Sequence, residues 1–173
     1  MSDLDILEIL KSRRSIRKFL DKKVESEKIH KILEVAMSAP SARNQQPWRF
    51  VIIDNRDTLD TIAEQHPYAK MLKTAPLAIA ICGKVENECE ENYWTQDCSA
   101  STENLLLATH VLGLGAVWIS IYPKEERMQI LIDNLELPKS IKPLALVAVG
   151  YANENKEKED RFDREKIFFN KFS

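Results

Sequence analysis

A run of six apolar residues at 77–82, LAIAIC, constrains the fold more than any other segment of the chain. The run has the length of a strand and offers no polar side chain on either of its two faces. Such a strand is expected to be covered on both faces, because neither face gains from contact with water. The chain must therefore build a sheet that has helices on both sides.

The rest of the chain predicts the other strands and the helices of such a layered domain. Further strands are expected at 49–54, 116–121 and 143–151, where apolar and β-branched residues dominate. The stretch ENLLLATHVLGLG, at 103–115, is apolar almost all round and predicts a central, covered helix over 93–112. With 173 residues the chain is long enough for one domain with a real core, and we expect a single domain. Other helices are expected at 4–10, 26–39, 57–65 and 124–135, with a loop and a helical turn at 66–76.

Charge, hydropathy and cysteine usage exclude several classes of protein. With a formal net charge of −2, the chain lacks the positive electrostatic field of a general nucleic-acid binder. No apolar run reaches the roughly 18 to 20 residues that span a bilayer, and MSDLDILEIL is unlike a secretory signal. Cys82, Cys89 and Cys98 form no CxxC pair and the three histidines are far apart, so we expect neither a disulfide framework nor a metal site. These features favour a reducing compartment, and we expect the cytoplasm.

A basic segment at 10–24, LKSRRSIRKFLDKKV, groups Arg13, Arg14 and Arg17 around Ser15. Such a cluster can bind nucleic acid, an anionic membrane surface or one phosphorylated small molecule. It can also be a solvated helix end, where cations favour the helix dipole. The near-neutral charge and the lack of an aromatic-basic platform count against nucleic acid, and the residues of this segment alone leave the other interpretations open.

The end of the chain combines a charged stretch with an aromatic terminus. Its sequence from residue 152 is ANENKEKEDRFDREKIFFNKFS. The charged part is typical of a free linker, whereas Phe162, Phe168, Phe169 and Phe172 indicate that the end packs on another surface. We expect that surface to belong to a second subunit.

Five motifs occur in order along the chain: RRSIRKF, SAPSARNQQPWRF, HPYAKML, GLGAVWISIYP and RFDREKIFFNKF. Over nearly its whole length the chain resembles the FMN-dependent nitroreductase family in its short form. RRSIRKF is a weak signal by itself, whereas SAPSARNQQPWRF after a helix is much more specific. The resemblance implies an α+β fold of three layers, α-β-α, with a mixed central sheet, in an intertwined homodimer that holds FMN at the subunit interface. It also implies that the tail at about 152–173 packs on the partner subunit.

The basic residues suit the phosphate and polyol end of FMN. Arginine presents planar paired donors that match phosphate oxygens, and a hydroxyl adds another donor. We therefore expect Arg13, Arg14 and Ser15 at this end of the cofactor. By resemblance, Arg161 is the second phosphate arginine, and this role would explain why so polar a tail is fixed in place.

By the same resemblance, Arg17 and Lys70 approach the N1 and C2 carbonyl edge of the flavin. A fixed positive charge there would stabilise the reduced form and raise the reduction potential, which is the kind of tuning that a protein supplies to a cofactor. Without the other motifs, Lys70 would be an ordinary exposed turn lysine.

The resemblance implies two further contacts with FMN. A polar loop, which the family takes from the partner subunit, would contact the ring and the ribityl chain, although its amides also suit simple turn chemistry. The segment VWISI would pass along the flavin, with the backbone N–H of Ser120 as candidate donor to N5, although many relatives have a glycine near here. Trp118 suits core packing equally well, and Tyr68 and Met71 are interpreted as packing residues. The loop residues expected at the cofactor are Pro40, Ser41, Ala42, Asn44 and Gln45, and the strand residues are Trp118, Ile119 and Ser120.

The resemblance implies an oxidoreductase that passes a hydride from NADH or NADPH through flavin N5 to an electron-poor acceptor. The acceptor would be a nitroaromatic, a quinone or another flavin, and the two substrates would use the same flavin face in turn, by a ping-pong mechanism. No side chain is expected to act as a general acid or base, because flavin, solvent and positioning can carry the reaction. The alternative is an FMN-binding carrier without turnover of its own, since a fold does not fix a reaction.

Overall fold

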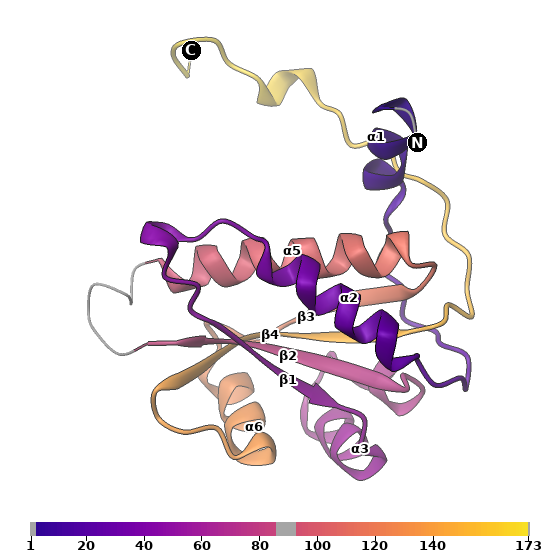
Figure 1. Ribbon diagram of the computed structural model, residues 1–173, viewed down its shortest axis with the longest axis vertical. Coiled ribbons are helices and arrows are strands. Elements are labelled where there is room, and N and C mark those ends of the chain that lie inside the picture. The colour runs from indigo at the N-terminus through magenta and orange to yellow at the C-terminus, as the bar shows by residue number, and fades with distance from the viewer. Residues whose placement is uncertain (1–2, 86–92, 173) are drawn as a thin grey trace.

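The computed structural model describes residues 3–85 and 93–172, and Figure 1 shows a sheet between two layers of helices. Every expected strand and helix is confirmed, with ends that differ by no more than two residues. The strands are β1 (Trp48–Ile53), β2 (Leu77–Lys84), β3 (Gly115–Ser120) and β4 (Ile141–Gly150). The helices are α1 (Asp3–Ser12), α2 (Ser26–Met37), α3 (Arg56–Gln65), α5 (Trp94–Val111) and α6 (Glu125–Leu135), with 3-10 turns η1 (Ala42–Asn44), η2 (Lys70–Lys73) and η3 (Arg164–Lys166).

The four strands lie in the order β1-β2-β4-β3, and each neighbouring pair is antiparallel. β1 and β3 are therefore the two edges of this sheet. The resemblance implies a mixed sheet, but these four strands pair only antiparallel, and the parallel bridge between Ser15 and Ala116 is isolated, with Ser15 outside the named strands. The backbone N–H of Ile16 donates to the carbonyl of Ala116 at 2.9 Å. This bridge holds the basic segment along the outer side of β3.

The side chains of β2 alternate between two separate cores, as the sequence LAIAIC predicts. Leu77, Ile79 and Ile81 pack with Ile32 in the core under α2 and α5. The residues between them pack in the second core, which α3, η2 and α6 cover. Figure 1 shows α2 and α5 on one face of the sheet and α3 and α6 on the other. Both faces of the central strands are thus removed from water. This burial of apolar surface is the main favourable contribution to the free energy of folding.

Helix α5 is the central, covered helix that the sequence predicts. Its buried residues include the polar side chains of Ser101, Thr102 and Thr109. Ser101 donates its hydroxyl proton to the carbonyl of Ala36 in α2 at 2.8 Å, so a buried hydrogen bond joins the two helices. The two threonines bond to carbonyls one turn earlier in α5, which satisfies their buried hydroxyls.

The two ends of the chain run close together. The N–H of Leu20 donates to the carbonyl of Tyr151 at 2.9 Å, and the N–H of Asn153 donates to the carbonyl of Lys18 at 2.8 Å. Beyond this point the tail passes the C-terminal part of α1, and its last residues project from the body of the molecule (Figure 1). Its four phenylalanines are exposed in the single chain: Phe162, Phe168, Phe169 and Phe172.

Across residues 3–85 and 93–172, no helix combines the length and the apolar character needed to cross a membrane.

Candidate functional site

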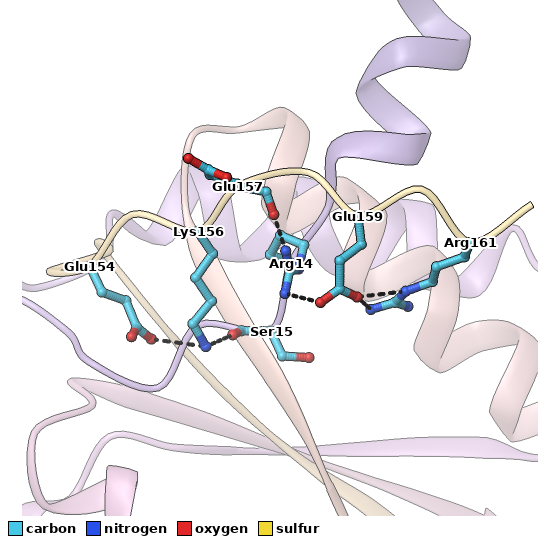
Figure 2. A network of polar contacts seen from close by, with 7 residues as sticks. All are labelled: Arg14, Ser15, Glu154, Lys156, Glu157, Glu159 and Arg161. Carbon is cyan, nitrogen blue, oxygen red and sulfur yellow. Dashed lines mark hydrogen bonds and ion pairs between the residues drawn. The ribbon is translucent and has the colours of Figure 1, made fainter.

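Two arginines from opposite ends of the chain hold one carboxylate between them (Figure 2). Nη2 of Arg14 donates to Oε1 of Glu159 at 2.8 Å. Nε and Nη2 of Arg161 donate to Oε2 of the same carboxylate at 2.9 and 2.7 Å. Hydrogen bonds from Arg161 and the positive charge of Arg14 hold the pKa of the Glu159 carboxyl below its usual value. The arginine pair therefore binds an ionised anion in this structure.

The tail reaches the basic segment through two further residues. Oε1 of Glu154 accepts hydrogen bonds from the backbone N–H groups of Arg17 at 2.5 Å and Lys18 at 3.1 Å. These bonds, of which the one from Arg17 is the larger cause, lower the pKa of the Glu154 carboxyl. Lys156 donates to the carbonyl of Ser15 at 2.7 Å, as Figure 2 shows. This part of the tail is thus held on the basic segment of its own chain, and packing of the tail on a partner subunit stays a prediction.

A cavity of about 580 Å³, which we call the tail cavity, opens between the basic segment and the tail. It contains all three arginines that the sequence assigns to the phosphate: Arg13, Arg14 and Arg161. Arg13 faces α5, with its Nε 3.4 Å from the carboxylate of Glu103. Ser15 is not among the lining residues, which are Leu10, Lys11, Arg13, Arg14, Lys158, Glu159, Asp160, Arg161 and Phe162.

A second cavity of about 390 Å³, which we call the edge cavity, lies along the outer side of β3. Arg17 and Lys70 are on its wall together with Arg127, and no carboxylate lines it. Among the described residues, none of these three side chains forms an ion pair with a carboxylate. The cavity is therefore electropositive. Its walls are Arg17, Pro67, Tyr68, Lys70, Met71, Val117, Trp118, Ile119, Ser120 and Arg127.

Arg127 closes one side of the edge cavity. Its Nη1 donates to the carbonyl of Ser120 at 3.1 Å, and its guanidinium carbon lies 5.0 Å from the centre of the Tyr68 ring. Nearby, His66 is only 1% exposed, and its Nδ1 accepts the N–H of Tyr68 at 3.2 Å. Burial, and next the charge of Arg127, lower the pKa of His66, so this ring is neutral near pH 7.

The polar loop expected at the cofactor lies at the other edge of the sheet. It runs directly into β1, and β1 is separated from β3 by three strand spacings, or about 14 Å. The N–H of Ala42 donates to Oδ1 of Asp97 in the first turn of α5 at 3.0 Å. Asn44 adopts φ 57°, which a short polar side chain tolerates. Within one chain, therefore, no residue of the stretch Pro40–Gln45 lines the edge cavity or the tail cavity.

The structure thus sorts the expected residues into three places. The arginines expected at the phosphate share the tail cavity, the strand residues and cations expected at the ring share the edge cavity, and the loop stands apart. Tyr68 and Met71, interpreted as packing residues, instead line the edge cavity, and Tyr68 is 65% exposed. Sequence reasoning missed Arg127 and Glu159. For Arg127 one signal was available in the sequence: it lies in the first turn of the helix that follows the strand expected at the flavin.

Comparison with known proteins gives a consistent result over the whole chain. The model of the nitroreductase family matches residues 10–66 and 62–151. A protein of Methanothermobacter thermautotrophicus is 43% identical over 99% of this chain and 90% of its own length. That relative is named, provisionally, an NADH dehydrogenase/NAD(P)H nitroreductase.

Solved structures share the fold as well. A crystal structure from Parabacteroides distasonis, under the same provisional name, superposes with a TM-score of 0.93 at 41% identity and covers 97% of this chain and 99% of its own. An FMN-dependent nitroreductase from Clostridium difficile superposes with a TM-score of 0.88 at 31% identity, over 96% of this chain and 99% of its own.

Proposed function

Since this chain belongs to the nitroreductase family, we propose that it is an NAD(P)H-dependent oxidoreductase that works through bound FMN. The names of its relatives support this general activity, and the FMN-dependent relative from Clostridium difficile supports the cofactor. The observation that carries the proposal is that the basic segment contributes arginines to two cavities, and in one of them two arginines already hold the carboxylate of Glu159.

The donors present suit the two ends of FMN. Arg14 and Arg161 converge on a carboxylate, and planar guanidinium groups bind phosphate oxygens in the same paired manner. Arg13 shares their cavity and adds a third positive charge. We assign this end of the site to the phosphate, with Ser15 beside it on the basic segment.

The edge cavity suits the flavin ring. Arg17 and Lys70 bring positive charge without a carboxylate to neutralise it, which would stabilise the negative charge that reduction places on the N1 and C2 carbonyl edge. Trp118 and Ile119 supply an apolar wall, and the backbone N–H of Ser120 is the proposed donor to N5. Arg127 binds the Ser120 carbonyl and so helps to fix the end of β3 at which this donor lies.

The position of the polar loop supports a homodimer with shared sites. Because residues 40–45 lie at the opposite edge of the sheet, they can reach FMN only in another subunit's site. The exposed phenylalanines of the tail offer apolar surface for such a partner. We therefore propose that each cofactor is bound between two copies of the chain.

When bound, FMN accepts a hydride from NADH or NADPH and delivers it to an electron-poor acceptor, for which we propose a nitroaromatic, a quinone or another flavin. The chain itself contributes binding, orientation and positive charge, and no side chain is assigned a proton transfer. Because both substrates would need the same open cavity in turn, we propose ping-pong kinetics. Initial rates at several acceptor concentrations should then give parallel double-reciprocal lines, and intersecting lines would contradict this order.

The first test is an absorbance spectrum of the purified protein, followed by addition of NADH or NADPH without air. We expect flavin bands that bleach and that return when an acceptor is added. Bands that stay oxidised would instead support a flavin carrier without turnover of its own. A protein that carries no flavin and does not bind added FMN would refute the proposed function.

A matched pair of variants tests the role of Arg17. Arg17→Ala should weaken FMN binding and lower the flavin reduction potential, since it removes a cation from the edge cavity. Lys18→Ala removes the same charge from the next residue, which does not line the cavity, and should change neither quantity. An unchanged potential and affinity in Arg17→Ala would refute the assignment.

A further inference from the structure

The carboxylate of Glu159 occupies the one point where the two proposed phosphate arginines meet. One carboxylate oxygen binds Arg14 and the other binds Arg161, so both guanidinium groups are engaged at once (Figure 2). The carboxylate and the phosphate of FMN are the same kind of ligand, a planar or tetrahedral oxyanion that accepts paired N–H donors. A phosphate that binds this arginine pair must therefore displace Glu159.

We propose that Glu159 is an internal substitute for the cofactor phosphate, which keeps free small anions off the Arg14–Arg161 pair until FMN replaces it. This inference rests on the proposed function, because it takes the arginine pair as the phosphate site. The inference assigns Glu159 two effects on the phosphate site. It lowers the affinity of the site for any phosphate, and it makes the site selective for the phosphate of FMN over free inorganic phosphate.

The surrounding contacts keep Glu159 close to the arginines. The carbonyl of Glu157 accepts a hydrogen bond from Arg14, and Lys156 binds the carbonyl of Ser15. A group tethered in this way has an effective concentration in the millimolar range at its site. Free inorganic phosphate, at similar concentrations, must compete with it. FMN has in addition the ring contacts of the edge cavity, so it can displace Glu159 where a free anion cannot.

The test compares Glu159→Gln with a matched control, Glu157→Gln, in the full-length protein freed of bound flavin. Both variants remove one negative charge from the same stretch of tail. The Glu157 carboxylate, however, points away from Arg14, as Figure 2 shows. FMN and riboflavin, which lacks the phosphate, are titrated by flavin fluorescence in a buffer without phosphate.

We expect Glu159→Gln to bind FMN about two- to fivefold more tightly than the wild type, the range expected from loss of one exposed ion-pair contact. Riboflavin affinity should stay the same, and Glu157→Gln should match the wild type for both ligands. Equal or weaker FMN binding by Glu159→Gln would overturn the inference, because it would mean that Glu159 only orients the arginines.

A second arm adds about 1 mM inorganic phosphate, chosen to stay within the millimolar range of the tethered group. FMN binding by Glu159→Gln should weaken more than binding by the wild type, in which Glu159 competes with the added phosphate. An equal effect of phosphate on both proteins would overturn the proposed exclusion of small anions. If the proposed function itself is wrong, the titrations give a different result, because the wild type then binds neither FMN nor riboflavin.

Discussion

Asp97 connects the polar loop to the central helix, and its removal should destabilise the protein by a predictable amount. Its side chain is 7% exposed, and its Oδ1 accepts the N–H of Ala42 at 3.0 Å. A hydrogen bond to a charged group contributes about 1.5–3 kcal/mol, and the carboxylate in the first turn of α5 also favours the helix dipole. Asp97→Ala should therefore lower the free energy of unfolding by about 2–3 kcal/mol.

Urea unfolding at a fixed chain concentration measures this loss. With a slope of about 2 kcal/mol per molar for a chain of this size, the midpoint should fall by about 1–1.5 M. Asp97→Asn keeps an acceptor for the N–H of Ala42 but loses the charge, so its midpoint should lie between those of the wild type and Asp97→Ala. If Asp97→Ala unfolded at the same urea concentration as the wild type, the loop would not depend on this bond and the reasoning would be wrong.

Two more predictions concern packing and pH. A methyl group on Gly83 would lie 2.5 Å from Cε3 of the buried Trp94 ring, so Gly83→Ala should destabilise the fold by about 1–3 kcal/mol; an unchanged thermal midpoint would show that the ring moves freely. Burial lowers the pKa of His66 and of His110, so below about pH 6.5 the unfolded chain binds protons that the folded chain does not. Stability should therefore fall as the pH drops from 6.5 toward 5, and His66→Gln should show a shallower dependence in urea titrations at each pH; identical slopes would contradict the assignment to His66.

The strands and helices could be predicted because the sequence patterns were unambiguous. LAIAIC has no polar face, and in the structure its residues enter two different cores. The pairing of the strands could not be predicted from the same patterns. Strands that alternate with helices are typical of parallel sheets, yet β1, β2, β3 and β4 pair antiparallel, because strand direction depends on where each connection returns.

The candidate site was predictable only in part, for a similar reason. Motifs predicted residues for the phosphate and the ring, and the structure groups most of them into two cavities, although Ser15 lines neither. Glu159 could not be found in this way, because one acid in a stretch of alternating charges carries no signal until its partners are known. Arg127 lies on a helix whose polar residues follow an ordinary surface pattern, so its place soon after a strand expected at the flavin was a weak signal, and the fold was needed to show that it reaches the cavity.

The contact between Arg14 and the tail also has a consequence for the order of events during synthesis. The ribosome makes Arg14 well over a hundred residues before Arg161, and chains grow at about 5–20 residues per second. A nascent chain therefore has the first arginine for many seconds without the second, and its β4 strand is also made late. The proposed phosphate end of the site is therefore assembled only after the tail has been made, and we expect the cofactor to be loaded after synthesis of β4 and the tail.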